Sequence, residues 1–342
     1  MNRNKTIGWI GVIASAVLIA GCSGSQDTAR IDPPPMNAEV VPVTDTAATD
    51  PQHVFTATVF VEDSDGFVAP LSVELPFDQP GVAATTLQYM VEGGPVEELL
   101  PEGFRALLPA GTEVTMDIDE SSRTATIDFN KAFANYAEED ERKILESIVW
   151  AMTGFPTIDH VQLWMDGKWL KEMPVARTPI EEPLSRTFGI NVEVAEGVDY
   201  SRATPVTLYF LNQSADNFTY YVPVTRMISW TDDIAGATVA ELAKGPLEPG
   251  KLDAVLMPGA EAAAVTARGD ALQVDFDSSI LASGDTAPAE GLQAVVLSLT
   301  DSTAAQGVQI TVDGKIQVIG TDGVNYGAQP VGRPKVLNAY EM

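Results

Sequence analysis

Hydrophobic and polar residues follow two different periods in the middle of the chain. Short segments that are rich in β-branched and aromatic residues, or that alternate strictly, predict β-strands at Val54–Val61, Phe67–Leu75, Glu113–Ile118 and Thr124–Phe129. Apolar residues four positions apart, with acids in the first turn, predict a helix over Glu138–Thr153, and Val82–Glu92 is also helix-like. A hairpin over Ile158–Glu172 follows, so the predicted order is β-β-α-β-β-α-β-β.

This pattern occurs twice. Lys143–Lys168 aligns without gaps on Glu290–Lys315, an offset of 147 residues (290 − 143), and the same offset carries Ile127-Asp128-Phe129 onto Val274-Asp275-Phe276. An ordered series of matches at one period indicates a duplication. The sequence therefore predicts two related domains, residues 54–174 and 204–320, with a linker over 175–203 and a Pro/Gly-rich tail over 321–342.

Each domain is predicted to have an α+β fold. Mostly antiparallel strands that pack on two helices form a two-layer sandwich, because the apolar face of a sheet must be covered by another element. The chain is thus expected to be two tandem sandwiches of this kind.

Glycine pairs with proline or aspartate at equivalent places in the two repeats. Gly94-Pro95 and Gly245-Pro246 predict helix ends. Asp166-Gly167 and Asp313-Gly314 stand between alternating apolar runs, which predicts two-residue hairpin turns of type I′. A catalytic or metal-binding carboxylate at these positions is the alternative, but such a role needs a second partner group, which the sequence does not offer.

The Asp166-Gly167 turn also predicts a register. Trp164 pairs with Trp169, and the neighbouring pairs are Met165 with Lys168, Leu163 with Leu170 and Gln162 with Lys171. One face of this hairpin is then apolar, whereas the other carries the two tryptophans among polar residues. Two interpretations stay open: the tryptophans pack under a loop or the other domain, or they form a partner-binding patch, since exposed aromatic clusters mark interfaces.

The N-terminus has the layout of a secretory signal. Arg3 and Lys5 precede an almost wholly apolar Ile7–Ala20, and the segment ends in Leu-Ile-Ala-Gly-Cys at Cys22. This ending resembles a bacterial lipobox, in which the cysteine takes a diacylglycerol after cleavage. We therefore expect a signal peptide over 1–21, lipidation of Cys22, a disordered tether over 22–53, and an extracytoplasmic protein held at the outer face of the cell membrane.

Composition and charge exclude several classes of function. The chain has 48 Asp and Glu against 20 Lys and Arg, which argues against a nucleic-acid partner. Cys22 is the only cysteine, and His53 and His160 are the only histidines, so a nucleophilic triad or a zinc site has few residues to draw on. We predict no enzyme activity, no cofactor and no metal site.

Together these features resemble the GerM family of sporulation and spore-germination lipoproteins. The resemblance rests on the lipobox, Ile31–Pro34 in the tether, Phe188–Glu193 in the linker and the duplicated motif series that ends in Asp-Gly-Lys. Met165 departs from the usual small residue before that motif. The resemblance implies a non-enzymatic, membrane-anchored assembly protein that docks envelope proteins of the mother cell–forespore channel, with domains similar to ring-building modules of secretion machinery. A lipoprotein that binds a peptidoglycan or germinant fragment is the alternative.

Overall fold

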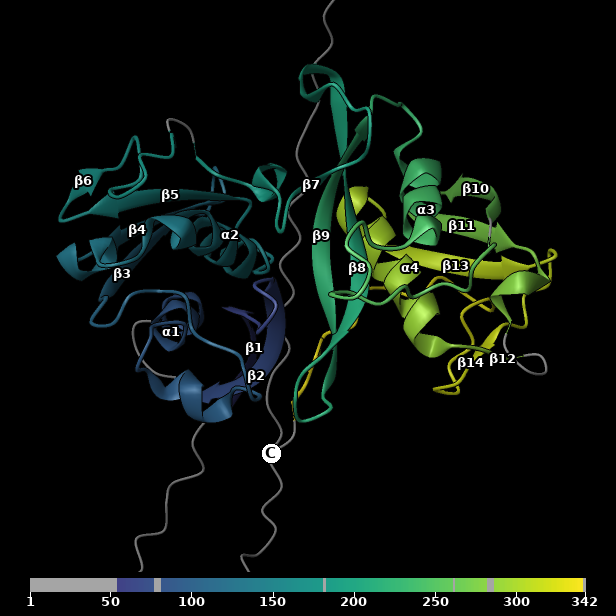
Figure 1. The fold of residues 1–342 in the computed structure, drawn as a ribbon, viewed down its shortest axis with the longest axis horizontal. Coiled ribbons are helices and arrows are strands. Elements are labelled where there is room, and N and C mark those ends of the chain that lie inside the picture. Colours follow the sequence, from purple (N-terminus) through teal and green to yellow (C-terminus); the bar gives the residue numbers. More distant parts are fainter. Residues whose placement is uncertain (1–53, 77–80, 181–182, 261, 282–285, 341–342) are drawn as a thin grey trace, which may run out of the picture. The chain divides into compact units, whose positions relative to one another are not determined.

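The computed structural model describes residues 54–76, 81–180, 183–260, 262–281 and 286–340 (Figure 1). The predicted signal peptide and the whole predicted tether, including Cys22 and His53, lie outside these residues.

The first repeat has the predicted element order. Its strands are β1 (Val54–Glu62), β2 (Val68–Pro76), β3 (Val114–Asp119), β4 (Thr124–Phe129), β5 (His160–Met165) and β6 (Lys168–Trp169), and its helices are α1 (Val82–Tyr89) and α2 (Glu141–Met152). Short 3-10 turns at Pro95–Leu99, Lys131–Ala134 and Glu138–Asp140 complete it.

The second repeat follows the same plan. Its strands are β8 (Ala203–Gln213), β9 (Thr219–Ser229), β10 (Ala262–Arg268), β11 (Ala271–Phe276), β12 (Thr286–Ala287), β13 (Gly307–Val312) and β14 (Ile319–Gly320), and its helices are α3 (Ile234–Lys244) and α4 (Ala289–Ser302). A 3-10 turn lies at Ser278–Ile280. The linker adds β7 (Glu193–Val194) and 3-10 turns at Arg186–Phe188 and Tyr200–Arg202.

The α+β class is confirmed, and the sheets mix two kinds of pairing. The hairpin pairs β1–β2, β3–β4, β5–β6, β8–β9 and β10–β11 are antiparallel. The pairs β4–β5 and β11–β13 are parallel, because a helix, α2 or α4, carries the chain back across the sheet between them.

In each repeat the helices lie between the sheet and the opening hairpin. Helices α1 and α2 contact β1 on one side and β3 and β5 on the other, and α3 and α4 contact β8, β10 and β13 in the same way. The hairpin thus adds a layer beyond the predicted sheet and helices. This position explains why α2 is buried on nearly all sides, with the polar Glu146 and Ser147 among its buried residues. Its apolar residues Ile144, Leu145, Ile148, Val149 and Met152 are all fully buried.

Helix α1 is shorter than predicted. We expected it to reach Glu92 and to stop at the following glycines, but it ends at Tyr89. The backbone of the next residues pairs with Leu108 instead: the Glu92 N–H donates to the Leu108 carbonyl at 2.8 Å, and the Leu108 N–H donates to Met90 at 3.1 Å. A long-range backbone pairing therefore overrides the local helical pattern.

Strands β2 and β9, one from each repeat, lie side by side (Figure 1). Each has a proline in its interior, Pro70 in β2 and Pro223 in β9. Proline has no N–H to donate, so it is tolerated in a strand where no ladder hydrogen bond is required of it. The two strands do not pair directly with each other. Side chains of the linker and the tail donate to the carbonyls of Pro223 and Pro70 instead.

The linker reaches into this seam with Ile190 and Asn191. Ile190 forms two hydrogen bonds with Thr225 of β9, one to its hydroxyl at 3.0 Å and one from its N–H at 2.8 Å. The Asn191 amide accepts from the Val68 N–H at 2.9 Å and donates to the carbonyls of Val68 and Pro223, both at 2.8 Å. One side chain thus joins the backbones of β2 and β9.

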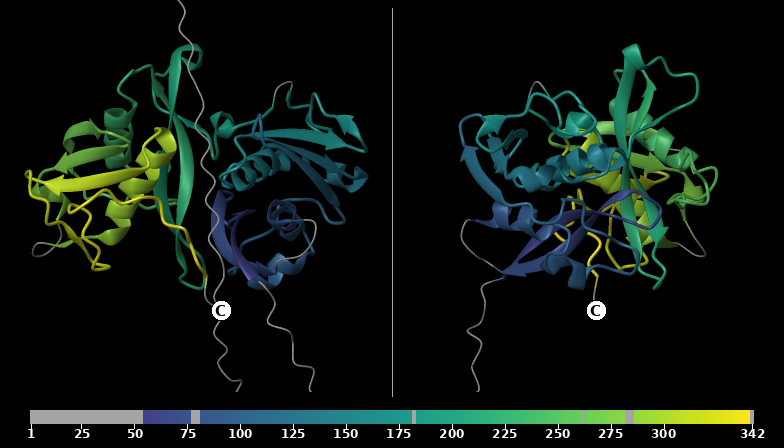
Figure 2. Two further views of the ribbon diagram at one scale, coloured as in Figure 1. Left: turned by 180° about the vertical axis from the view of Figure 1, so that it is seen from behind. Right: turned by 60° about the vertical axis from the view of Figure 1, so that its left-hand side comes forward.

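The tail does the same from the other side with Leu337 and Asn338, and Figure 2 shows this segment, in yellow, beside the hairpins. Leu337 forms two hydrogen bonds with Ser72 of β2, at 2.8 and 3.0 Å. The Asn338 amide accepts from the Tyr221 N–H at 2.8 Å and donates to the carbonyls of Pro70 at 2.7 Å and Tyr221 at 2.8 Å. The seam is therefore closed by two equivalent clasps, each of them an aliphatic residue followed by asparagine.

The two clasps are themselves part of the repeat. Leu337 follows Ile190, and Asn338 follows Asn191, by the same 147 residues that relate the domains (337 − 190). Both asparagines have positive φ, 47° and 54°, a conformation that asparagine tolerates better than most residues. The duplicated unit therefore extends beyond residues 174 and 320.

Replacing either clasp asparagine by glycine tests this account. Glycine accepts the positive φ, so the substitutions Asn191→Gly and Asn338→Gly remove the amide without adding backbone strain. Each leaves a proline carbonyl without its donor, and we expect each to lower the free energy of unfolding by roughly 2–3 kcal/mol. Denaturant unfolding monitored by circular dichroism measures the loss. The matched control is the exposed Asn135, whose change to glycine should have less than about half that effect.

Candidate interaction surfaces

The two Asp-Gly pairs form turns with both residues at positive φ. The angles are 50° and 72° at Asp166 and Gly167, and 50° and 71° at Asp313 and Gly314. Positive φ at both central residues is the requirement of a type I′ turn. The Asp166 carboxylate forms a surface ion pair with Lys131 at 3.5 Å.

The neighbouring strand braces each turn with a carboxylate that the sequence reasoning did not single out. Asp128 of β4 accepts the Gly167 N–H at 3.0 Å, and Asp275 of β11 accepts the Gly314 N–H at 2.9 Å. The signal was present, since the two acids occupy the same place in the repeat. The acid that matters for these hairpins therefore lies beside the turn.

The two Gly-Pro pairs are structural as well. Gly245, with φ 77°, ends α3, and its carbonyl accepts from Arg226 at 2.8 Å. Gly94 lies where a β-carbon would come within 2.7 Å of the Val91 carbonyl oxygen. Pro95 begins the 3-10 turn that follows, whereas Pro246 stands directly after the α3 cap.

The tryptophan hairpin pairs as predicted near its turn. Trp164 lies opposite Trp169 and Met165 opposite Lys168. The predicted pair of Gln162 with Lys171 does not form, because the chain leaves the edge after Leu170, and Leu184 of the linker pairs with Val161 instead.

The tryptophans lie on the open face of the β3-β4-β5-β6 sheet. Trp169 is 39% exposed, and Trp164 is half-buried. The Trp164 indole N–H is buried and has no hydrogen-bond partner among the described residues. Thr126, Asp128 and Gln162 share this face. Thr126 and Asp128 alternate with buried residues along β4, and in the register they lie beside Gln162 and Trp164. We call this surface, defined by Trp164, Trp169, Gln162, Thr126 and Asp128, the tryptophan face.

The second repeat differs at the same positions. Thr311, which aligns with Trp164, is fully buried and donates to Asp275 at 2.6 Å. Ile316, which aligns with Trp169, is 60% exposed. The two repeats therefore share the turn and its brace but present different side chains around it.

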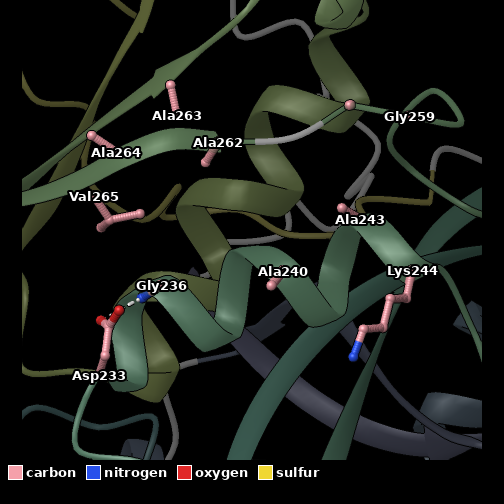
Figure 3. A pocket seen from close by; sticks show the side chains of 11 residues that line it. Asp233, Gly236, Ala240, Ala243, Lys244, Gly259, Ala262, Ala263, Ala264 and Val265 are labelled. Carbon is pink, nitrogen blue, oxygen red and sulfur yellow. Dashed lines mark hydrogen bonds between the residues drawn. The ribbon is translucent and has the colours of Figure 1, made fainter.

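A groove of about 490 Å³ lies in the second repeat between α3 and β10 (Figure 3). Its lining is almost entirely small side chains, including Gly236, Ala240 and Ala243 of α3 and Ala262, Ala264 and Val265 of β10. Asp233 at its end caps α3 by accepting the Gly236 N–H at 2.9 Å. The groove thus offers close backbone approach and few charged groups.

Most buried charges in the described residues hold elements together. Arg226 is fully buried and binds Glu193 at 2.6 Å, Glu241 at 3.1 Å and the Gly245 carbonyl at 2.8 Å, which joins β9, the linker and α3. Asp301 of α4 forms ion pairs with Arg186 of the linker and Arg333 of the tail, both at 2.8 Å.

Two buried carboxyls belong to the region between the repeats. Asp63 accepts from Tyr220 at 2.8 Å and Asn212 at 3.0 Å, and its burial raises the pKa of its carboxyl despite these hydrogen bonds. Glu146 of α2 accepts from the Asn191 N–H at 3.1 Å, and its burial likewise raises its pKa, against the Arg142 guanidinium 2.9 Å away.

Within the described residues, no group of three or more His, Cys, Asp and Glu residues is arranged to hold a metal ion. His160 is exposed at the start of β5. Among these same residues, no helix has the length and apolar character needed to cross a membrane.

Comparison with known proteins gives consistent matches. A family model described as "Germane: Sporulation and spore germination" matches residues 58–171 and 207–318. The spore germination protein GerM of Bacillus subtilis (strain 168) is 37% identical over 95% of this chain and 95% of its own length. The chain belongs to the Germane family.

A solved structure extends the match to the tandem arrangement. The tandem GerMN domains of the sporulation protein GerM from Bacillus subtilis superpose with a TM-score of 0.79 at 37% identity, over 84% of this chain and 100% of that one. The resemblance inferred from the motifs is therefore correct, and this Germane protein belongs among proteins of sporulation and spore germination.

Substitutions in the Asp166-Gly167 turn separate its backbone role from any role of the carboxylate. Asn tolerates positive φ, so Asp166→Asn should leave the free energy of unfolding within about 0.5 kcal/mol of the parent. Gly167→Val forces a β-branched residue into the left-handed region and should cost about 1–2 kcal/mol. Urea unfolding of the two variants gives the comparison, and an asparagine variant as damaged as the valine one would contradict the assignment.

Glu146 should make the fold more stable as the solution becomes mildly acidic. A carboxyl whose pKa is higher in the folded than in the unfolded state binds its proton more readily when folded. Lowering the pH from neutrality through the window above its ordinary pKa therefore stabilises the fold. We expect the difference in unfolding free energy between the parent and Glu146→Gln to shift toward the parent between pH 7 and pH 5. Denaturant titrations at several pH values test this, and a pH-independent difference would contradict it.

Proposed function

We propose that this Germane protein is a non-enzymatic assembly lipoprotein of sporulation and spore germination. In this proposal Cys22 carries the lipid, and residues 22–53 tether the tandem domains to the outer face of the cell membrane. The domains dock envelope proteins of the channel between mother cell and forespore.

We infer the docking role from the tryptophan face. Trp169 is exposed, and the buried indole N–H of Trp164 lacks a partner among the described residues. Leaving such a donor unsatisfied is unfavourable, and a partner carbonyl or carboxylate would satisfy it. Tryptophan is enriched at the centres of protein interfaces, where it contributes a large share of the binding energy.

Local charge favours a protein partner with acceptor groups. Lys168 and Lys171 flank the pair, with the Lys171 ammonium 5.6 Å from the Trp169 ring centre. These two lysines offset the Asp128 carboxylate of this face, whereas the chain as a whole carries a net charge of −28. A partner that brings carboxylates here meets less repulsion than it would elsewhere.

The buried charges support a non-catalytic role, since those that lie between elements are engaged with each other. Arg226 and Asp301 join strands and helices to the linker and tail. The repeated Asp-Gly acids sit in turns. The layout of residues 1–22 supports the membrane anchor.

The experiment compares surface variants in sporulating cells. We expect Trp169→Ser, alone and with Trp164→Ser, to reduce crosslinking of the protein to its envelope partners by on the order of tenfold or more, because a central tryptophan contributes 2 kcal/mol or more. Trp169→Ser should leave the melting temperature nearly unchanged, since the side chain is well exposed.

The matched control is Ile316→Ser, at the equivalent exposed position of the second repeat, which should leave crosslinking intact. Unchanged crosslinking in both tryptophan variants would overturn the docking assignment. Thermal stabilisation by muropeptides that is lost in Trp169→Ser would instead make the face a binding site for cell-wall fragments.

A further inference from the structure

We propose that two copies of this chain associate through β10, with the two β10 strands paired antiparallel across a two-fold axis. The sheets of the second repeats then continue into each other. This interface lies in the second repeat and is independent of the tryptophan face.

The starting observation is an unprotected strand edge. Among the described residues β10 pairs only with β11 and forms one end of the β10-β11-β13 sheet (Figure 1). Every residue of β10 is exposed or half-buried. Natural proteins usually protect such an edge with charges, prolines or a covering segment, because its free N–H and C=O groups invite another strand.

Other strand edges of the second repeat are covered. At the far end of the same sheet, Val308 of β13 pairs with Val331, and the Ile310 N–H donates to Tyr326 at 2.9 Å. The outer edge of β8 is satisfied by two hydroxyls of α4: Ser298 accepts from Tyr209 at 3.0 Å and Ser302 from Thr207 at 2.8 Å. The open edge of β10 is therefore a local exception.

In the first repeat, the equivalent edge strand β3 is protected by acidic side chains. Its edge strand β3 has Asp117 and Asp119 opposite Thr126 and Thr124. The corresponding positions of β10, opposite Gln273 and Ala271, are Thr266 and Arg268. Two copies of β3 would bring aspartates together, which is unfavourable for cross-strand neighbours. The sequence Ala-Ala-Ala-Val-Thr-Ala-Arg of β10 contains no acid, so it can pair with itself.

The alanine-lined groove provides room for a second set of contacts in this interface, between the α3 helices of the two copies. Helix α3 contacts β10 and presents Gly236, Ala240 and Ala243 to the groove beside it (Figure 3). When two β10 edges join, the α3 helices of the two copies approach each other across the axis. Small side chains allow helices to pack closely, so the groove would be filled by the second copy.

The choice of a second copy follows from this self-complementarity. A two-fold interface uses the same patch on both partners, and antiparallel pairing of identical strands has that symmetry. The net charge of −28 opposes association at long range, so the dimer should strengthen with salt, which screens repulsion between copies.

The test uses the chain without residues 1–22, which has no cysteine and no apolar leader. Sedimentation equilibrium should show a monomer–dimer equilibrium at micromolar to submillimolar concentrations, with a larger dimer fraction at higher NaCl. Thr266→Asp, which copies the acid of β3, should raise the dissociation constant by on the order of tenfold. The charge-matched control Thr115→Asp, on β3, should leave it unchanged.

Single-cysteine variants provide a second readout that does not depend on affinity. Thr266→Cys should crosslink to itself with a short bis-maleimide reagent, whereas Thr115→Cys should not. A monomer at every concentration, a dimer indifferent to Thr266→Asp, or growth into species larger than a dimer would each overturn the proposal. None of these outcomes bears on partner docking by the tryptophan face, which crosslinking of Trp169→Ser in cells measures separately.

Discussion

Two asparagine amides set the arrangement of the whole tandem. Pro70 and Pro223 have no N–H, so the facing edges of β2 and β9 lack the donors that direct strand pairing would need. Each proline carbonyl therefore needs a hydrogen bond from another part of the chain. Asn191 and Asn338 supply these hydrogen bonds and at the same time pair with Val68 and Tyr221 as a strand residue would. Segments outside the predicted domain limits therefore join one repeat to the other.

The two repeats share their internal construction and differ in their exposed residues. Both repeats keep the same internal devices: a braced Asp-Gly turn, a parallel crossover and a buried second helix. They differ at positions where the shared fold does not constrain the side chain. The first repeat carries tryptophans on its sheet and aspartates on its edge strand, whereas the second carries threonine and isoleucine on the sheet and alanines at the edge. Duplication thus preserved the frame, and the surfaces became specialised.

The sequence predicted the elements and the local geometry well. Alternation and helical spacing located the strands and helices, and Asp166-Gly167 fixed the register of Trp164 against Trp169. Long-range contacts have no such local signal. The sequence therefore did not predict that pairing with Leu108 follows the end of α1 at Tyr89, or that Leu184 pairs beside β5 where Lys171 was expected. The clasps were visible in principle, because Ile190-Asn191 and Leu337-Asn338 obey the duplication period. Their role depends on backbone groups of strands far away in the chain, which no period of apolar residues reveals.

The position of the second clasp near the end of the sequence determines when the seam can close during synthesis. Strands β2 and β9 are both complete long before Leu337 and Asn338 are made, so a growing chain can build the cores of its two repeats but not the second bridge between them. Domains form as units from the N-terminus during synthesis. Closing the seam is then the last event of folding, and a chain that ended just before Leu337 would have two formed halves that are joined by one clasp instead of two.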